Sequence, residues 1–115
     1  MYRQNAIVDK SKAFAIRIIR MYKYLGDKKK GYILSKQILR SGTSIGANVK
    51  EAVYAFSKPE FYVKMGIALK EANETEYWLE LLHTTEYLTE GQFNSIYPEC
   101  KELIRLLISI CKTRH

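Results

Sequence analysis

Glu80 and His83 have the spacing of a metal-binding pair. They lie three residues apart in Glu80-Leu81-Leu82-His83, the pattern by which di-iron carboxylate bundles point a Glu and a His inward. Such a site needs a second Glu-x-x-His pair and two further glutamates on facing helices. The only other histidine is His115, at the far end of the sequence, which cannot complete the set. We therefore expect no metal, no cofactor and a surface or interface position for His83.

Motifs for nucleophilic catalysis and for nucleotide-triphosphate binding are also missing. With one interior histidine, no Ser–His–Asp or Cys–His set can be assembled. Gly42 and Gly46 are not followed by Gly-Lys-Ser/Thr, so they do not form a Walker loop. The sequence predicts a protein that is not an enzyme.

Positively charged side chains form the remaining candidate site. The net charge is +7, yet residues 1–50 carry twelve Lys and Arg against two acids, whereas residues 51–115 carry seven against ten. Side chains three or four residues apart share a helix face, and phosphate binding needs this charge density in no particular order. The predicted nucleic-acid contacts are Arg17, Arg20, Lys23, Lys28, Lys29, Lys30, Lys36 and Arg40. The alternative is a solvated basic face that only maintains solubility.

Aromatic and acidic residues leave the use of this charge open. Tyr22, Tyr24 and Tyr32 are interleaved with the cations and could stack on unpaired bases. Nine tyrosines in a small helical protein also suit packing at subunit interfaces. Five acids of the third predicted helix supply the opposite charge: Glu71, Glu74, Glu76, Glu80 and Glu86. They would face a basic helix of the same bundle, or meet a neighbouring copy head-to-tail and close a ring.

Four segments with apolar residues at helical spacing must position these side chains. The first has a stripe from Ile7 to Leu25 and should end at Gly26, and the second has a seam from Leu34 to Phe56. Capping-box patterns at residues 57–60 and 89–92 open the third and fourth segments.

Two features of these segments lead to local predictions. The small residues around Gly42 and Gly46 predict a close helix–helix approach, with Ser and Thr hydroxyls bonded back to their own helix. A smooth surface for a partner backbone is the other interpretation. Pro98 should kink or restart the fourth helix, because it lacks an N–H group and clashes with the preceding turn.

The connections between the segments are short, which makes consecutive helices antiparallel. The sequence predicts an all-α, antiparallel up-down-up-down four-helix bundle, a single domain over residues 1–115. It has no apolar run of about 18 residues and no signal-peptide pattern, so we expect no membrane partner. Cys100 and Cys111 would lie about 16 Å apart on one helix, too far for a disulfide. They are expected to be buried thiols in a reducing cytoplasm.

From Leu34 to Leu88 the sequence resembles a known bacterial family. The stretches LSKQILRSGTSIGANVKEA, SKPEFYVKMGIALKEANETEYWLELL and EYL are similar to four-helix-bundle proteins encoded in intervening sequences of 23S ribosomal RNA genes, often labelled S23-type ribosomal proteins. The resemblance implies assembly as a homopentamer and no known catalytic residues. A fold relative, the accessory variability determinant of diversity-generating retroelements, is a basic pentameric barrel that binds nucleic acid and a reverse transcriptase. The family usually has Ile then Ala where this sequence has Val49 and Lys50, which leaves the role of Lys50 open.

These observations together predict a non-enzymatic homo-oligomer, expected to be a pentamer, that binds nucleic acid through residues 10–50. Structured RNA is the expected ligand. The alternative is a protein-interaction scaffold whose basic helices contact other subunits or a partner protein.

Overall fold

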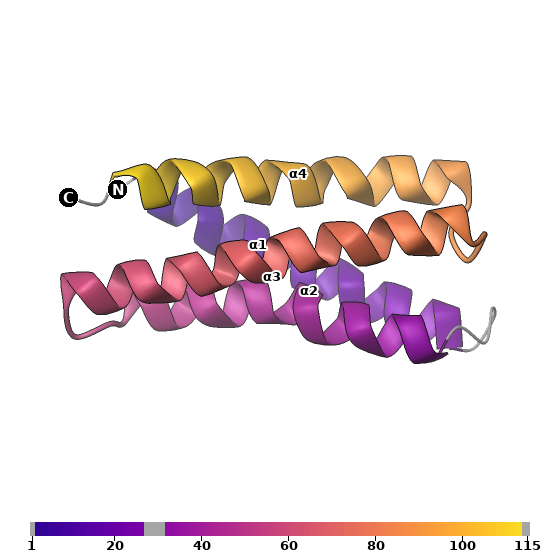
Figure 1. Cartoon of the computed structure of the whole chain (residues 1–115), viewed down its shortest axis with the longest axis horizontal. Helices are drawn as coiled ribbons and strands as arrows, with labels where there is room; N and C mark the ends of the chain where they lie inside the picture. Colours follow the sequence, from indigo (N-terminus) through magenta and orange to yellow (C-terminus); the bar gives the residue numbers. More distant parts are fainter. Residues whose placement is uncertain (1, 27–31, 114–115) are drawn as a thin grey trace.

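Four long helices make up the chain. The structure, a computed structural model, describes residues 2–26 and 32–113. The helices are α1 (Tyr2–Tyr24), α2 (Tyr32–Val53), α3 (Lys58–Thr84) and α4 (Glu90–Lys112), with no strand in the described ranges. They lie lengthwise in a body of 45 × 21 × 19 Å, and consecutive helices run in opposite directions (Figure 1). The predicted all-α, up-down-up-down bundle is confirmed.

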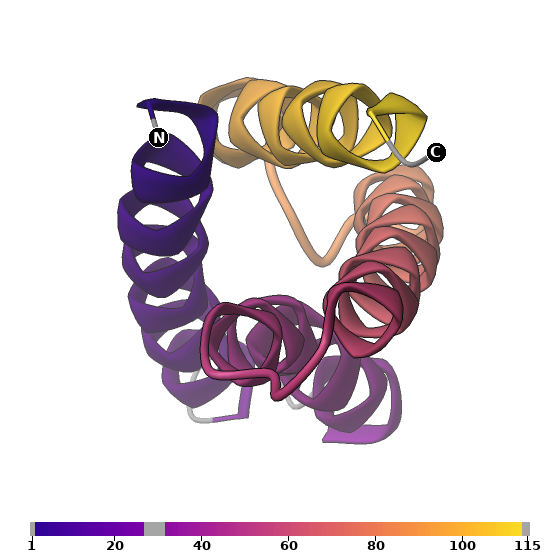
Figure 2. The same ribbon diagram turned by 90° about the vertical axis from the view of Figure 1, so that its left-hand side faces the viewer.

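The helices form a closed ring around one apolar interior. Seen from one end, α1, α2, α3 and α4 follow each other around the ring, and α4 returns to α1 (Figure 2). The inward stripes meet in one cluster that includes Phe14, Ile38, Met65 and Leu107, all 1% exposed or less. Burying one such side chain stabilises the fold by about 1.5–3 kcal/mol relative to exposure.

Capping residues start the last two helices, and of the two predicted capping boxes the one at residues 89–92 is complete. The Thr89 hydroxyl accepts the Gln92 N–H, and the Gln92 side chain accepts the Thr89 N–H, which completes a capping box for α4. The Ser57 hydroxyl accepts the Glu60 N–H at the start of α3. Here the Glu60 carboxylate accepts the N–H of Phe56 rather than that of Ser57. Both caps satisfy N–H groups that have no partner inside the helix.

One local prediction is wrong, and one of the two outcomes predicted for Pro98 does not occur. The seam of the second helix does not extend to Phe56, because α2 ends at Val53 and leaves the Phe56 side chain 99% exposed. The fourth helix does not restart at Pro98, since α4 is continuous on both sides of it. A proline at this position removes the bond to the carbonyl of Asn94, and both residues are exposed, so water can satisfy that carbonyl.

The close approach predicted for the glycines of the second helix is confirmed. A Cβ atom at Gly42 would lie 2.8 Å from Cγ1 of Ile18, and one at Gly46 would lie 3.4 Å from the carbonyl oxygen of Ser11. The Thr43 hydroxyl donates to the carbonyl of Leu39 at 2.7 Å. The glycines therefore let α1 and α2 pack closely, and a hydroxyl side chain bonds back to α2.

No helix in the described ranges is both long and apolar enough to cross a membrane.

Candidate nucleic-acid interface

Arg17 is held by α4 rather than directed to solvent. Its guanidinium donates to the Glu99 carboxylate at 2.6 Å, to the Ser95 carbonyl at 3.2 Å and to the Ser95 hydroxyl at 3.0 Å. These contacts join α1 to α4 on both sides of Pro98. Its positive charge is compensated within the chain, which lowers its value as a phosphate contact.

Arg40 is compensated in the same way by α3. Its guanidinium pairs with Glu71 at 3.4 Å and with Glu74. Glu74 also accepts the indole N–H of Trp78. The acidic third helix therefore faces a basic helix of the same bundle at this point, one of the two arrangements that the sequence allows.

The other predicted contacts divide into exposed residues and residues outside the structure. Arg20, Lys23 and Lys36 are exposed, and none of them has an ion-pair partner in the ranges that the structure describes. Lys28, Lys29 and Lys30 lie outside the described residues. Lys23 lies in the last turn of α1 and Lys36 near the start of α2, so the connection between the two helices brings them to one end of the bundle.

Two lysines that the predicted set leaves out lie at the same helix pair. Lys12 of α1 and Lys50 of α2 are exposed and line one groove of about 440 Å³ between these helices. Small residues, including Ala15, Gly46 and Ala47, also line the groove. The close approach of α1 and α2 brings the two cations together. The helical spacing of the sequence could have placed both lysines on outward faces.

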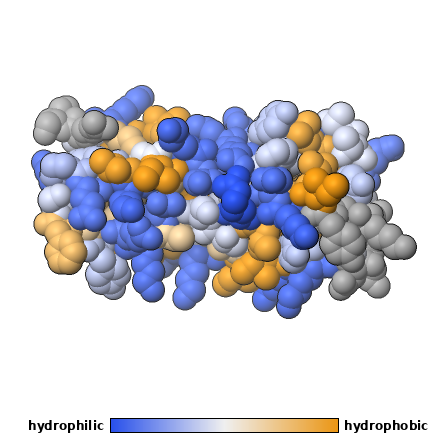
Figure 3. All heavy atoms as spheres, turned by 60° about the horizontal axis from the view of Figure 1, so that its bottom comes forward, coloured by the Kyte–Doolittle hydropathy of each residue, from blue (hydrophilic) through white to orange (hydrophobic). Residues whose placement is uncertain are grey.

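Apolar and hydrophilic side chains alternate over the surface near α2. In the view of Figure 3, hydrophilic residues cover much of the middle, and apolar residues form separate groups rather than one continuous strip. The most exposed large apolar side chains include Ile33, Tyr54 and Phe56, at 81%, 75% and 99%. Tyr54 and Phe56 belong to the connection between α2 and α3.

The acids of α3 also bind partners on α4. Lys101 pairs with Glu76 at 2.7 Å, and the Tyr97 hydroxyl donates to Glu80 at 2.6 Å. This hydrogen bond, together with burial and the charge of Glu76, raises the pKa of Tyr97. The hydrogen bond to Glu76 raises the pKa of Lys101.

The Glu80–His83 pair has separate partners. Glu80 accepts the Tyr97 hydroxyl, while Nε2 of His83 lies 2.7 Å from a carboxylate oxygen of Glu90. The His83 ring stacks on Phe93 with centroids 4.1 Å apart. Within the described ranges, no three His, Cys, Asp or Glu residues are arranged to hold a metal ion.

The two cysteines form no disulfide and have different surroundings. Cys100 is fully buried and donates to the carbonyl of Ala72, whereas Cys111 is partly exposed. Burial, and to a lesser extent the nearby charge of Glu76, raises the pKa of the Cys100 thiol to about 12. Since the thiolate is the reactive form, Cys100 is a structural residue rather than a nucleophile.

The geometry defines an all-α bundle whose first two helices carry exposed cations without an ion-pair partner among the described residues. The chain belongs to the 23S rRNA-intervening sequence protein family, whose model matches residues 3–109. A solved structure from Bacteroides thetaiotaomicron VPI-5482, described as a protein with unknown function from the S23 ribosomal protein family, is similar to this chain. It is 56% identical with a TM-score of 0.93, over 96% of this chain and 98% of that chain. No curated protein matches the sequence. The family that the sequence resembles is thus confirmed.

Proposed function

We propose that this protein is a non-enzymatic homo-oligomer that binds RNA through the outer sides of α1 and α2. The contacts come from five exposed cations, here called the basic face: Lys12, Arg20, Lys23, Lys36 and Lys50. They bind phosphates without reading sequence.

The observation that carries this proposal is the uneven use of charge within the chain. Within the described ranges, six acids lie in ion pairs with Lys or Arg: Glu51, Glu71, Glu74, Glu76, Glu99 and Glu102. The cations of the basic face have no such partner in the part of the chain that the structure describes. An uncompensated cationic surface attracts a polyanion, and binding releases the counterions condensed on it.

RNA is the favoured polyanion because the family is named for an intervening sequence of 23S rRNA. A partner that binds along the basic face must also match cations that are spread over two helices without a regular pattern. A phosphate backbone has this property, whereas a protein partner would need complementary carboxylates at matching positions.

Salt-dependent binding tests the proposal directly. Affinity for a structured RNA, measured by filter binding between about 50 and 200 mM salt, should fall steeply as salt rises. The double variant Lys12→Gln/Lys50→Gln should bind at least about tenfold more weakly and lower the magnitude of the salt slope by about two, one for each lost phosphate contact. RNA that fails to bind at low salt, or binds with no salt slope, would sink the proposal.

A matched variant separates a local effect from a general loss of charge. Arg105 and Lys112 are exposed on α4, and neither pairs with an acid within the described ranges. Arg105→Gln/Lys112→Gln removes the same net charge and should leave the salt slope within about half a unit of the wild-type value. Equal losses in both double variants would show that net charge alone attracts the RNA.

A protein-interaction scaffold is the second candidate, favoured by the exposed Tyr54 and Phe56. Exposed aromatic residues of this kind are common in interfaces between proteins. Light scattering on the Lys12→Gln/Lys50→Gln variant discriminates the two functions. An intact oligomer that no longer binds RNA supports RNA binding, and an oligomer that dissociates assigns the charge to assembly.

A further inference from the structure

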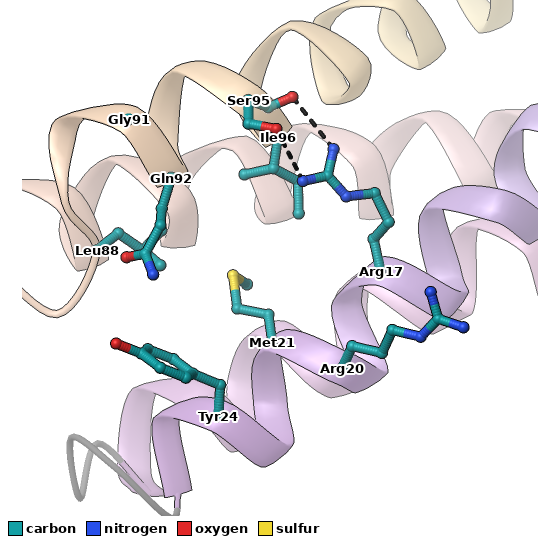
Figure 4. A pocket seen from close by; sticks show the side chains of 9 residues that line it. All are labelled: Arg17, Arg20, Met21, Tyr24, Leu88, Gly91, Gln92, Ser95 and Ile96. Atoms are coloured by element: carbon teal, nitrogen blue, oxygen red, sulfur yellow. Dashed lines mark hydrogen bonds between the residues drawn. The ribbon is translucent and has the colours of Figure 1, made fainter.

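A cavity of about 470 Å³ lies between the end of α1 and the start of α4, apart from the groove that holds Lys12 and Lys50. Figure 4 shows Met21 and Tyr24 of α1 directed toward Leu88 and Gln92 on the opposite wall. Arg17 spans one end of the cavity and reaches Ser95. The volume falls within the range of small-molecule sites, about 300–1,000 Å³.

The polar groups of this cavity are mostly hydrogen-bond donors. The side-chain oxygen of Gln92 accepts the Thr89 N–H, which leaves its amide nitrogen as the part available to a ligand. Arg17 uses one nitrogen for Glu99 and the Ser95 carbonyl and another for the Ser95 hydroxyl, and a guanidinium has five N–H donors. None of the residues that line the cavity is acidic. The cavity is therefore suited to a ligand that is anionic and rich in acceptors.

The other walls are apolar and partly aromatic. Leu88 and Ile96 are 3% exposed and form a rigid surface, while Met21 and the 37% exposed ring of Tyr24 face the cavity from α1. A thioether and a phenol ring offer polarizable contacts to a flat aromatic group. One flat apolar part and one anionic part is the chemical make-up of a nucleotide.

We propose that this cavity holds one unpaired nucleotide of a bound RNA strand, an inference that rests on the proposed RNA binding. The base lies between Tyr24 and Ile96, and its phosphate lies toward Arg20. Arg20 belongs both to the basic face and to the lining of the cavity, so a strand on that face passes the entrance. Base stacking on an aromatic side chain tolerates any base, as phosphate contacts do.

The methionine methyl groups give a direct readout of occupancy. The sequence has three methionines, of which Met21 lines the cavity and Met65 is fully buried in the core. In the full chain labelled with methyl-¹³C methionine, a short single-stranded RNA should shift the Met21 signal in a saturable manner and leave Met65 in place. A blunt RNA duplex, which offers no unpaired base, should leave both signals in place. A Met21 signal that stays constant while the single strand binds would overturn the cavity proposal and leave RNA binding intact.

Adenosine monophosphate distinguishes a site for a free mononucleotide from a site for one nucleotide of an RNA strand. A Met21 shift with this compound and with the single-stranded RNA supports the proposal. A shift with the mononucleotide in a protein that binds no RNA would overturn both the proposed function and the RNA source.

Two glycines provide a matched pair of variants. A Cβ atom at Gly91, which lines the cavity, or at Gly66 on α3 meets no atom within 4 Å, so both sites accept a larger side chain. Gly91→Leu should weaken binding of the single strand about tenfold by occupying the cavity, the size expected for one lost stacking contact. Gly66→Leu should leave the affinity unchanged. Equal affinities for Gly91→Leu and the wild type would contradict the proposal.

Discussion

Gly42 lies at a close approach of α1 and α2. A Cβ atom there would lie 2.8 Å from Cγ1, 3.0 Å from Cγ2 and 3.3 Å from Cβ of Ile18. Ile18 is fully buried and β-branched, so its χ1 angle is restricted, and rotation about χ1 does not change the tight 3.3 Å contact with its own Cβ. The glycine costs helix propensity, and the close packing of two helices offsets that cost.

Replacing Gly42 should therefore destabilise the bundle although alanine favours helices. Gly42→Ala gains about 0.5–1 kcal/mol of helix propensity but forces the helices apart, which costs about 1–3 kcal/mol. We expect a net loss of about 1–2 kcal/mol in the free energy of unfolding, measured by urea denaturation. Gly66→Ala, at a site with open space, should instead be stabilising. Stabilisation by both substitutions would contradict the close approach.

The candidate site is less predictable from sequence than this glycine. Spacing along a helix shows which cations share a face, but not which of them an acid neutralises. Arg17 is compensated by Glu99, 82 residues away, and that pairing exists only once α1 lies against α4. Lys12 and Lys50 share a groove only because α1 and α2 pack antiparallel. Such contacts depend on the tertiary arrangement and have no local sequence signal.

The helices themselves were largely predictable because caps and apolar spacing are local. Ser57, Thr89 and Gln92 act as their sequence patterns indicate. One error occurs where a pattern continues past its element. Phe56 has the spacing of the α2 seam but follows the end of the helix, so its ring is exposed. Pro98 is a helix breaker by composition, yet α4 continues because its long apolar face is buried on both sides of the proline.

The C-terminus of α3 contains a strained residue. Glu86 has φ of 70°, a left-handed conformation that normally favours glycine. The Tyr87 N–H donates to the carbonyl of Leu82, and the Glu86 N–H donates to the carbonyl of His83. This arrangement closes the helix and usually has glycine at the left-handed position.

Glu86→Gly should raise the free energy of unfolding by about 0.5–1 kcal/mol, because it relieves this backbone strain. Glu86→Ala is the control, since it removes the charge but keeps a Cβ atom in the left-handed conformation. In urea denaturation at neutral pH, Glu86→Gly should have a clearly higher free energy of unfolding than Glu86→Ala. Equal stability of the two variants would mean that the carboxylate, close to the negative end of the α3 dipole, is responsible instead.

At the scale of the whole molecule, four groups on α3 and α4 hold their protons more tightly in the folded state: Lys64, Tyr97, Cys100 and Lys101. Burial raises the pKa of Cys100 to about 12. The pKa of Tyr97 is raised mainly by its hydrogen bond to Glu80, and the pKa values of Lys64 and Lys101 are raised by hydrogen bonds to Glu51 and Glu76. These hydrogen-bonded pairs join α2 to α3 and α3 to α4, so they connect neighbouring helices of the ring.

The sign of the pH dependence follows from this common direction. The folded protein keeps protons that the unfolded chain releases, so stability is fully present below the unfolded pKa values and is lost as pH rises through the folded ones. For Cys100 the window runs from 9.0, the ordinary value of a thiol, to about 12. Within it this one group lowers the free energy of unfolding by up to about 1.4 kcal/mol per pH unit.

Urea denaturation at pH 8, 9, 10 and 11 tests this dependence. The free energy of unfolding should fall with pH above about 9 in the wild type, and Cys100→Ala should fall less steeply by about 1 kcal/mol per pH unit. Tyr97 and the two lysines titrate in every variant, so their contribution cancels in the comparison. Parallel slopes for Cys100→Ala and the wild type would show that the thiol is ionised as easily in the folded bundle as in the unfolded chain.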